Sequence, residues 1–153
     1  MKLLDSMINK FDAVVLLTTT DDDLNHRLGE FNKDKTASKI YEAYDSIDAK
    51  ATAILQHVSI MIAVTSLLFS LAAYPILKVT FVCELLFYIV LALTCLRLFM
   101  TQHMSPKFHE TKNVVAKEAV LDLTGKFTFL VSIGLILTIV AEVTVNIFEA
   151  SPK

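Results

Sequence analysis

The sequence is poor in the residues that interrupt helices and in those that build metal sites. Its 153 residues include only 3 glycines, 3 prolines and 2 cysteines. Because glycine and proline are the usual breakers of regular helices, their scarcity predicts an all-α chain. A glycine-rich phosphate loop is also missing, because Gly29, Gly125 and Gly134 stand far apart in the sequence.

Catalytic and metal-binding chemistry has little support in this sequence. Cys83 and Cys95 are twelve residues apart, which is about 18 Å along a helix and too far for a disulfide between them. They also lack the close pairing of a zinc site. The histidines have no ligand partners at helical spacing, and they are His26, His57, His103 and His109. We therefore expect a protein that is not an enzyme and that uses no cofactor or metal.

Hydrophobic residues make up 54% of the chain, and the mean hydropathy is +0.57. This is more apolar than a soluble domain of this size needs for its core. Long apolar runs extend over 58–77, 79–100 and 127–148. Each run can cross hydrocarbon about 30 Å thick at about 1.5 Å per residue. The sequence thus predicts an all-α membrane protein with three spans.

One stretch, from Ile40 to Ala72, keeps a seven-residue rhythm that is typical of a helix seam. Its charged positions end near Lys50, so we expect one long helix that begins in water and finishes in lipid. We expect the seam to join copies of the chain in a homo-oligomer, with a tetramer as the first guess. Packing of three helices within one chain would use the same residues, which are Ile40, Tyr44, Ile47, Ala51, Ile54, Val58, Met61, Thr65, Leu68 and Ala72.

The N-terminal part of the chain is polar and amphipathic. Residues 2–17 have the spacing of an amphipathic helix, which we expect to pack onto later soluble helices, with a membrane-surface anchor as the alternative. Residues 18–35 are interpreted as a polar connector whose aspartates cap a helix. A calcium loop is disfavoured there, because the spaced oxygen ligands are missing.

Basic residues indicate the orientation of the spans. On the side of the membrane that holds the N-terminus, the basic residues are Lys33, Lys35, Lys39, Lys50, Arg97, Lys107, Lys112, Lys117 and Lys126. The other side has only Lys78 and Lys153. The positive-inside rule places the N-terminus in the cytoplasm and the C-terminus outside. We therefore expect a cytoplasmic helical region (1–57), a three-span region (58–148) with a cytoplasmic hairpin (101–126), and an external tail (149–153).

Polar residues inside the apolar runs suggest an ion pathway. Glu84 and Glu142 lie at similar depth below the outer ends of the second and third spans. In a symmetric oligomer such carboxylates form acidic rings that favour cations. The alternative is that each one reaches the headgroups or is hydrogen-bonded between helices. The other pore candidates are Thr138 and Asn146 on the third span and Ser59, Ser66 and Ser70, which form a small-residue stripe with Ala63 and Ala73. Close helix packing is the commoner use of such a stripe.

The start of the first span carries a short motif made of Asp48, Ala49, Lys50, Ala51, Ile54 and Leu55. In these residues it resembles the small bacterial transmembrane effectors of nucleotide-signalling anti-phage systems, such as the Pycsar membrane effectors. The general plan is similar to the channel protein of the Hailong system. The match covers about Asp45 to Ala63, and elsewhere the likeness is one of size and helical architecture.

The resemblance implies a ligand-gated pore or a membrane-disrupting oligomer in the bacterial inner membrane. Its ligand would be a cyclic nucleotide or short oligonucleotide, made by a partner nucleotidyltransferase, that opens the pore or holds it shut. Phosphates need cations and bases need aromatic rings. The candidates are Arg27, Lys33, Lys35, Lys39, Lys107 and Lys112 for the phosphates and Phe31, Tyr41 and Phe108 for a base.

Charge gives this nucleotide site limited support. Residues 1–57 hold 7 basic and 10 acidic residues, a net charge of −3. Ordinary solvated helix faces are therefore the alternative interpretation of each lysine. We expect a regulated ion-conducting effector that impairs the membrane when active. The competing hypotheses are a non-conducting adaptor that docks a cytoplasmic partner and a holin-like lesion former.

Overall fold

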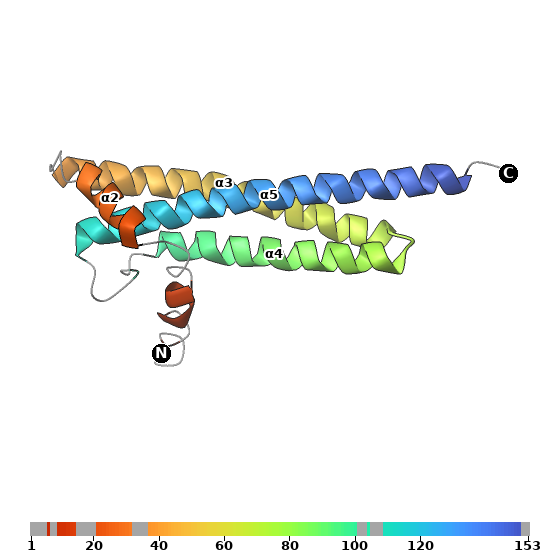
Figure 1. Ribbon diagram of the computed structural model, residues 1–153, viewed down its shortest axis with the longest axis horizontal. Coiled ribbons are helices and arrows are strands. Elements are labelled where there is room, and N and C mark those ends of the chain that lie inside the picture. Colours follow the sequence, from red (N-terminus) through yellow and green to blue (C-terminus); the bar gives the residue numbers. More distant parts are fainter. Residues whose placement is uncertain are drawn as a thin grey trace. The chain divides into compact units, whose positions relative to one another are not determined.

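The computed structural model describes residues 6, 9–14, 21–31, 37–100, 104 and 109–150. The helices of this part are α2 (Asp21–Phe31), α3 (Ala37–Leu71), α4 (Pro75–Phe99) and α5 (Glu110–Ala150), shown in Figure 1. Residues 9–14 are also helical. The described residues include no strand, so the all-α expectation is confirmed for this part of the chain.

Helices α3, α4 and α5 are each long and apolar enough to cross a membrane. Of their most apolar stretches, only 11% of α3, 28% of α4 and 11% of α5 is buried within the chain. Large apolar side chains such as Leu67 and Phe129 are 60% and 70% exposed. So much uncovered apolar surface is unfavourable in water but suits a hydrocarbon environment. The expectation of three membrane-span helices is confirmed at this level.

The turn between the first two apolar helices lies earlier in the chain than expected. Helix α3 ends at Leu71, and α4 begins at Pro75, so Leu77 belongs to the second helix and not to the first. Proline suits the first position of a helix, because its fixed φ is helical and the N–H it lacks would have no intrahelical partner there. The sequence-based boundary at Leu77 was therefore wrong.

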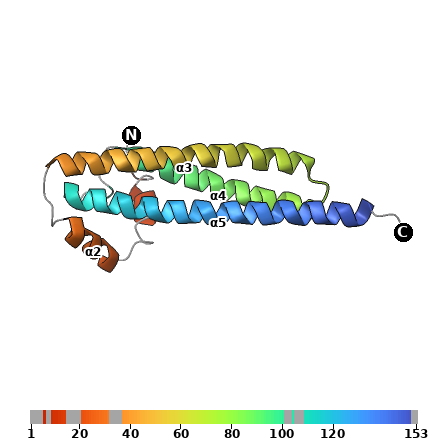
Figure 2. The same ribbon diagram turned by 90° about the horizontal axis from the view of Figure 1, so that it is seen from above.

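The described helices belong to two compact units, the first made of residues 1–52 and 97–123 and the second of residues 53–96 and 124–153. In the second unit, parts of α3, α4 and α5 lie side by side (Figure 2) and share one apolar core. Phe81 and Tyr88 are fully buried in this core and stand two turns apart on one face of α4. The other buried members are Val58, Ala72, Leu91 and Leu135.

The seam of α3 packs inside the chain. Val58, Thr65 and Ala72 are buried in the second unit, and Ile47 and Ala51 are buried in the first. The seam residues between them in the second unit, such as Met61 and Leu68, are partly buried against the same core. Side chains of the same chain thus cover these seam residues, whereas assembly of copies through the seam stays a prediction. The alternative of packing within one chain is the one observed.

In the first unit, α2 packs onto the beginning of α5. Leu24 is buried with Val115, Ala116 and Ala119, and Leu28 packs beside it. Leu24 and Leu28 are four residues apart, so they lie on one face of a helix. The interpretation of residues 18–35 as a connector was therefore wrong for 21–31, where contact with α5 stabilises a helix in a mostly polar segment.

Candidate functional site

Glu84 of α4 is buried and hydrogen-bonded to a neighbouring helix. Its side chain is 8% exposed, and Thr138 of α5 donates a hydrogen bond of 2.8 Å from Oγ1 to Glu84 Oε1. The second oxygen, Oε2, is buried and has no hydrogen-bond partner among the described residues. The structure thus joins two predicted pore residues in a helix contact within one chain, which is the alternative that the sequence had left open for Glu84.

The polar face of α5 becomes more exposed toward the C-terminus. Thr138 and Glu142 are half-buried, whereas Asn146 is exposed. These residues are four apart and share one face, but only the first of them takes part in the Glu84 contact. Asn146 is therefore the member of this face that remains open to a neighbour or to water.

The small-residue stripe of α3 lies on the surface of the chain. All of its members are exposed: Ser59, Ala63, Ser66 and Ser70 lie on α3, and Ala73 follows the end of this helix at Leu71. The serine hydroxyls donate to backbone carbonyls of their own helix, over 2.8 Å from Ser59, 2.7 Å from Ser66 and 2.6 Å from Ser70. Their protons are satisfied within the helix, while the oxygens remain able to accept another hydrogen bond.

A second polar contact in the second unit joins residues that the sequence pattern did not bring together. His57 Nε2 and Ser132 Oγ are 2.9 Å apart, and the buried Tyr88 hydroxyl donates to the same Ser132 oxygen over 3.4 Å. The sequence offers His57 no ligand partner at helical spacing, and the contact with Ser132 is a hydrogen bond of another kind. Ser132 stands on another helix, 75 residues away in the sequence, so no local pattern could have indicated it.

In the first unit, Arg97 at the end of α4 forms a buried ion pair with Asp12. Arg97 donates from Nε to Oδ1 over 2.6 Å and from Nη2 to Oδ2 over 2.5 Å. The two side chains are only 5% and 4% exposed. Two parallel charge-assisted bonds of this kind fix the geometry of both groups. Arg97 Nη1 is buried as well, and it has no hydrogen-bond partner among the described residues.

Lys117 of α5 caps the C-terminal end of α4 in the first unit. Its ammonium donates to the carbonyls of Leu98, over 3.2 Å, and Met100, over 2.5 Å. Carbonyls at the end of a helix lack intrahelical donors, so a lysine suits this place. Burial lowers the pKa of Lys117 from its usual value, the Arg97 cation lowers it further, and the carboxylates of Asp48 and Asp12 oppose the shift.

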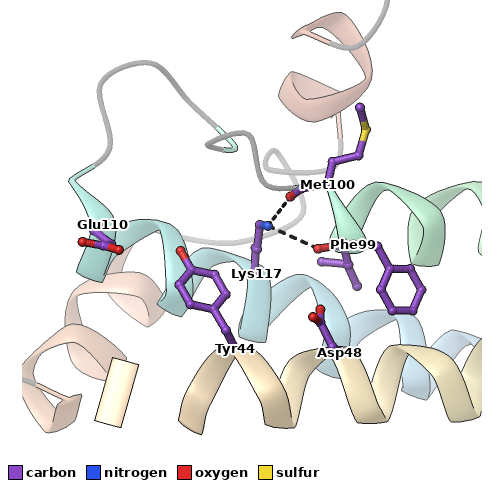
Figure 3. Close-up of a pocket in the computed structure, with 7 residues that line it drawn as sticks. Tyr44, Asp48, Phe99, Met100, Glu110 and Lys117 are labelled. Atoms are coloured by element: carbon purple, nitrogen blue, oxygen red, sulfur yellow. Dashed lines mark hydrogen bonds between the residues drawn. The ribbon is translucent and has the colours of Figure 1, made fainter. Parts of the chain in front are cut away.

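A cavity of about 300 Å³ lies beside Lys117. Figure 3 shows the lysine between Tyr44 and the last residues of α4, with its Nζ 5.6 Å from the centre of the Tyr44 ring. Asn113 holds that ring by donating from Nδ2 to the tyrosine hydroxyl over 3.1 Å. The cavity lining consists of Tyr44, Asp48, Leu98, Phe99, Met100, Glu110 and Lys117.

The nucleotide-binding candidates from the sequence do not line this cavity where they are described. Arg27 forms an ion pair of 3.4 Å with Asp122, Tyr41 is 71% exposed, and Lys112 is half-buried. The remaining candidates lie outside the described residues, or their side chains do: Lys33, Lys35, Lys107 and Phe108 in the first case, Phe31 and Lys39 in the second.

Sequence reasoning also missed the cluster of Asp12, Arg97, Asn113 and Lys117. One signal was available, because an arginine near the end of an apolar run needs a partner. The identity of that partner was not visible, because Asp12 precedes Arg97 by 85 residues.

Comparison with known proteins gives no relative: no protein-family model, no curated protein and no solved structure matches this chain. Within the part of the chain that the structure describes, no group of three or more His, Cys, Asp or Glu side chains is placed to hold a metal ion.

Proposed function

We propose that this chain is the subunit of a homo-oligomeric, regulated ion-conducting effector in a bacterial inner membrane, with its N-terminus in the cytoplasm. The observation that carries the proposal is the exposed stripe of Ser59, Ser66 and Ser70 on an apolar helix. The seam of α3 is used inside the chain, so this stripe is the polar surface that α3 offers to another copy.

Small and hydroxyl-bearing residues allow helices to approach closely, and they can also line a narrow wet path. Several copies that turn this face of α3 toward a common axis would surround such a path with serine oxygens. Asn146 and Glu142 on α5 supply further polar groups, and the carboxylate favours cations. Glu84 and Thr138 have a different role in this proposal, because their hydrogen bond holds α4 to α5 within a subunit.

Regulation is proposed to act through the first unit, residues 1–52 and 97–123. The likeness of about Asp45 to Ala63 to anti-phage effectors supports a nucleotide ligand from a partner nucleotidyltransferase, and a role in defence that impairs the membrane. The cavity beside Lys117 supports a ligand site in this unit, because it combines a buried cation with the aromatic side chains of Tyr44 and Phe99.

Cysteine accessibility in liposomes tests the conducting role. Cys83 and Cys95 are first replaced by alanine, and Ser66→Cys is introduced into that background. If Ser66 faces a water-filled path, a charged thiol reagent added to proteoliposomes reacts with the new cysteine and removes most of the ion flux. The matched control is Leu67→Cys on the next residue, which is also exposed but is turned about 100° from Ser66 around the helix, so flux persists after treatment.

The outcome decides between the candidate functions. Folded, inserted protein that passes no ions with any cyclic or linear oligonucleotide contradicts the channel and favours the adaptor. Release of large solutes together with ions favours a holin-like lesion. Equal inhibition at Ser66 and Leu67 removes the serine stripe from the ion path.

A further inference from the structure

The Asp12 carboxylate satisfies only part of the hydrogen-bonding capacity of Arg97. A guanidinium has five N–H donors in a planar fork. Asp12 takes one from Nε and one from Nη2, whereas the buried Nη1 has no partner among the described residues. A buried donor without a partner is costly. The site therefore offers more donors than its present occupant uses.

The charges around this pair favour an anion. As whole residues, backbone included, Arg97 and Lys117 are 6% and 2% exposed, and Asp12, at 3%, is the buried carboxylate beside Arg97. Lys117 donates to the carbonyl of Leu98, the residue next to Arg97, so the two cations lie near each other, and Arg97 helps to lower the pKa of Lys117. Asp48 also acts on Lys117, but it is exposed, so water screens its charge. The buried groups thus hold two positive charges and one negative charge.

We propose that Arg97 and Lys117 form a binding site for phosphate groups, and that Asp12 of the N-terminal segment occupies this site in the present structure. A phosphate can accept from Nε and Nη2 as the carboxylate does, and it carries more negative charge than a carboxylate to balance the two buried cations. Phosphate binding and docking of residues 9–14 then exclude each other. This inference rests on the proposed regulation of the channel by a ligand of the first unit. It names phosphate as the chemical group that is bound and the release of residues 9–14 as the change that binding causes.

A binding experiment on the full chain tests the site without relying on ion flux. The protein is placed in phosphatidylcholine nanodiscs and titrated calorimetrically with inorganic pyrophosphate. If the segment is docked about nine-tenths of the time, it weakens apparent binding about tenfold. We therefore expect Asp12→Asn to bind pyrophosphate about tenfold more tightly than the wild type.

Two further variants make this test specific. The double variant Asp12→Leu with Arg97→Met replaces the buried pair by apolar side chains, a change that proteins often tolerate, and it should no longer bind pyrophosphate. Arg27→Met removes a different arginine that pairs with Asp122, and it should bind as the wild type does. Wild-type affinity in the double variant, or equal loss in Arg27→Met, overturns the proposal.

Hydrogen exchange in the wild type tests the competition even if Asp12→Asn fails to fold. Pyrophosphate should accelerate exchange of the amides of residues 9–14 severalfold, and unchanged exchange at saturating pyrophosphate contradicts displacement. The phosphate can come from a soluble ligand or from a lipid headgroup. Faster exchange in nanodiscs containing phosphatidylglycerol, with no added effect of pyrophosphate, identifies the lipid. Pyrophosphate binding without ion flux overturns the channel and keeps the site, whereas flux without binding does the reverse.

Discussion

Glu84 shows how one side chain can join two apolar helices. A carboxylate in an apolar environment needs a hydrogen-bond partner, and the only one that the described residues give it is the Thr138 hydroxyl. Thr138 also approaches the carbonyl of Gly134, at 3.1 Å. The single hydroxyl proton of Thr138 has two possible acceptors, and the bond to Glu84 of α4 is shorter than the bond to Gly134 of its own helix.

Removal of this hydroxyl should weaken the contact between α4 and α5. We expect Thr138→Val to lower the free energy of unfolding by about 1–3 kcal/mol, because it leaves both carboxylate oxygens of Glu84 without a partner. Thermal unfolding in detergent measures the loss. Thr144→Val is the control, because that threonine is exposed and bonds within its own helix at 2.7 Å. Equal losses in the two variants would show that the Glu84 contact contributes nothing.

Lys117 should give the protein a dependence of stability on pH. Its pKa in the folded chain lies below its usual value of 10.5, so in the interval between the two values the unfolded chain binds more protons. The free energy of unfolding therefore increases as pH rises through that interval. Lys117→Met removes this increase, which unfolding at a series of alkaline pH values detects. A variant with the same pH dependence as the wild type would contradict the assignment.

Helix α2 depends on its contact with α5 more than on its own sequence. Gly29 lies in the last turns of α2, and glycine has a low helix propensity. A Cβ added at Gly29 would meet no atom within 4 Å, and no glycine of the described chain has positive φ.

Gly29→Ala should therefore stabilise α2 by about 1 kcal/mol. Amide hydrogen exchange in α2 reports this as roughly fivefold greater protection. Leu24→Ala is the opposite control, because it removes a side chain that is 4% exposed in the contact with α5 and should decrease protection. Unchanged exchange in both variants would mean that α2 does not open as a separate unit.

The elements that the sequence predicted well are those whose signal is local. The apolar runs and the seven-residue seam of α3 arise from neighbouring residues, so their helical structure and the buried face could be predicted. The helix at Asp21–Phe31 could not, because its apolar side chains find their partners on α5. The same reason applies to the site, where Arg97, Lys117 and Asp12 meet only through the fold, whereas the sequence pattern pointed to single lysines in polar segments.

Three helices that each cross a membrane would leave the two ends of the chain on opposite sides of it. From the distribution of lysine and arginine we expect the C-terminus to lie outside. Alkaline phosphatase fused after Lys153 should be active in the periplasm, and the same enzyme inserted near residue 105 should be inactive. Fluorescent-protein fusions at both positions are the control, because they should show the reverse pattern. Activity at residue 105 would contradict the proposed orientation.

The pairing of Asp12 with Arg97 also sets an order of events during synthesis. The two residues are 85 positions apart, so a ribosome working at about 5–20 residues per second needs roughly 4 to 17 seconds to synthesise the chain from Asp12 to Arg97. During this time the N-terminal segment waits without its partner while the first helices insert. Its docking then reports that α4 has emerged far enough to present Arg97. A chain whose insertion fails would keep this segment open to proteases, which would link quality control to the ion pair.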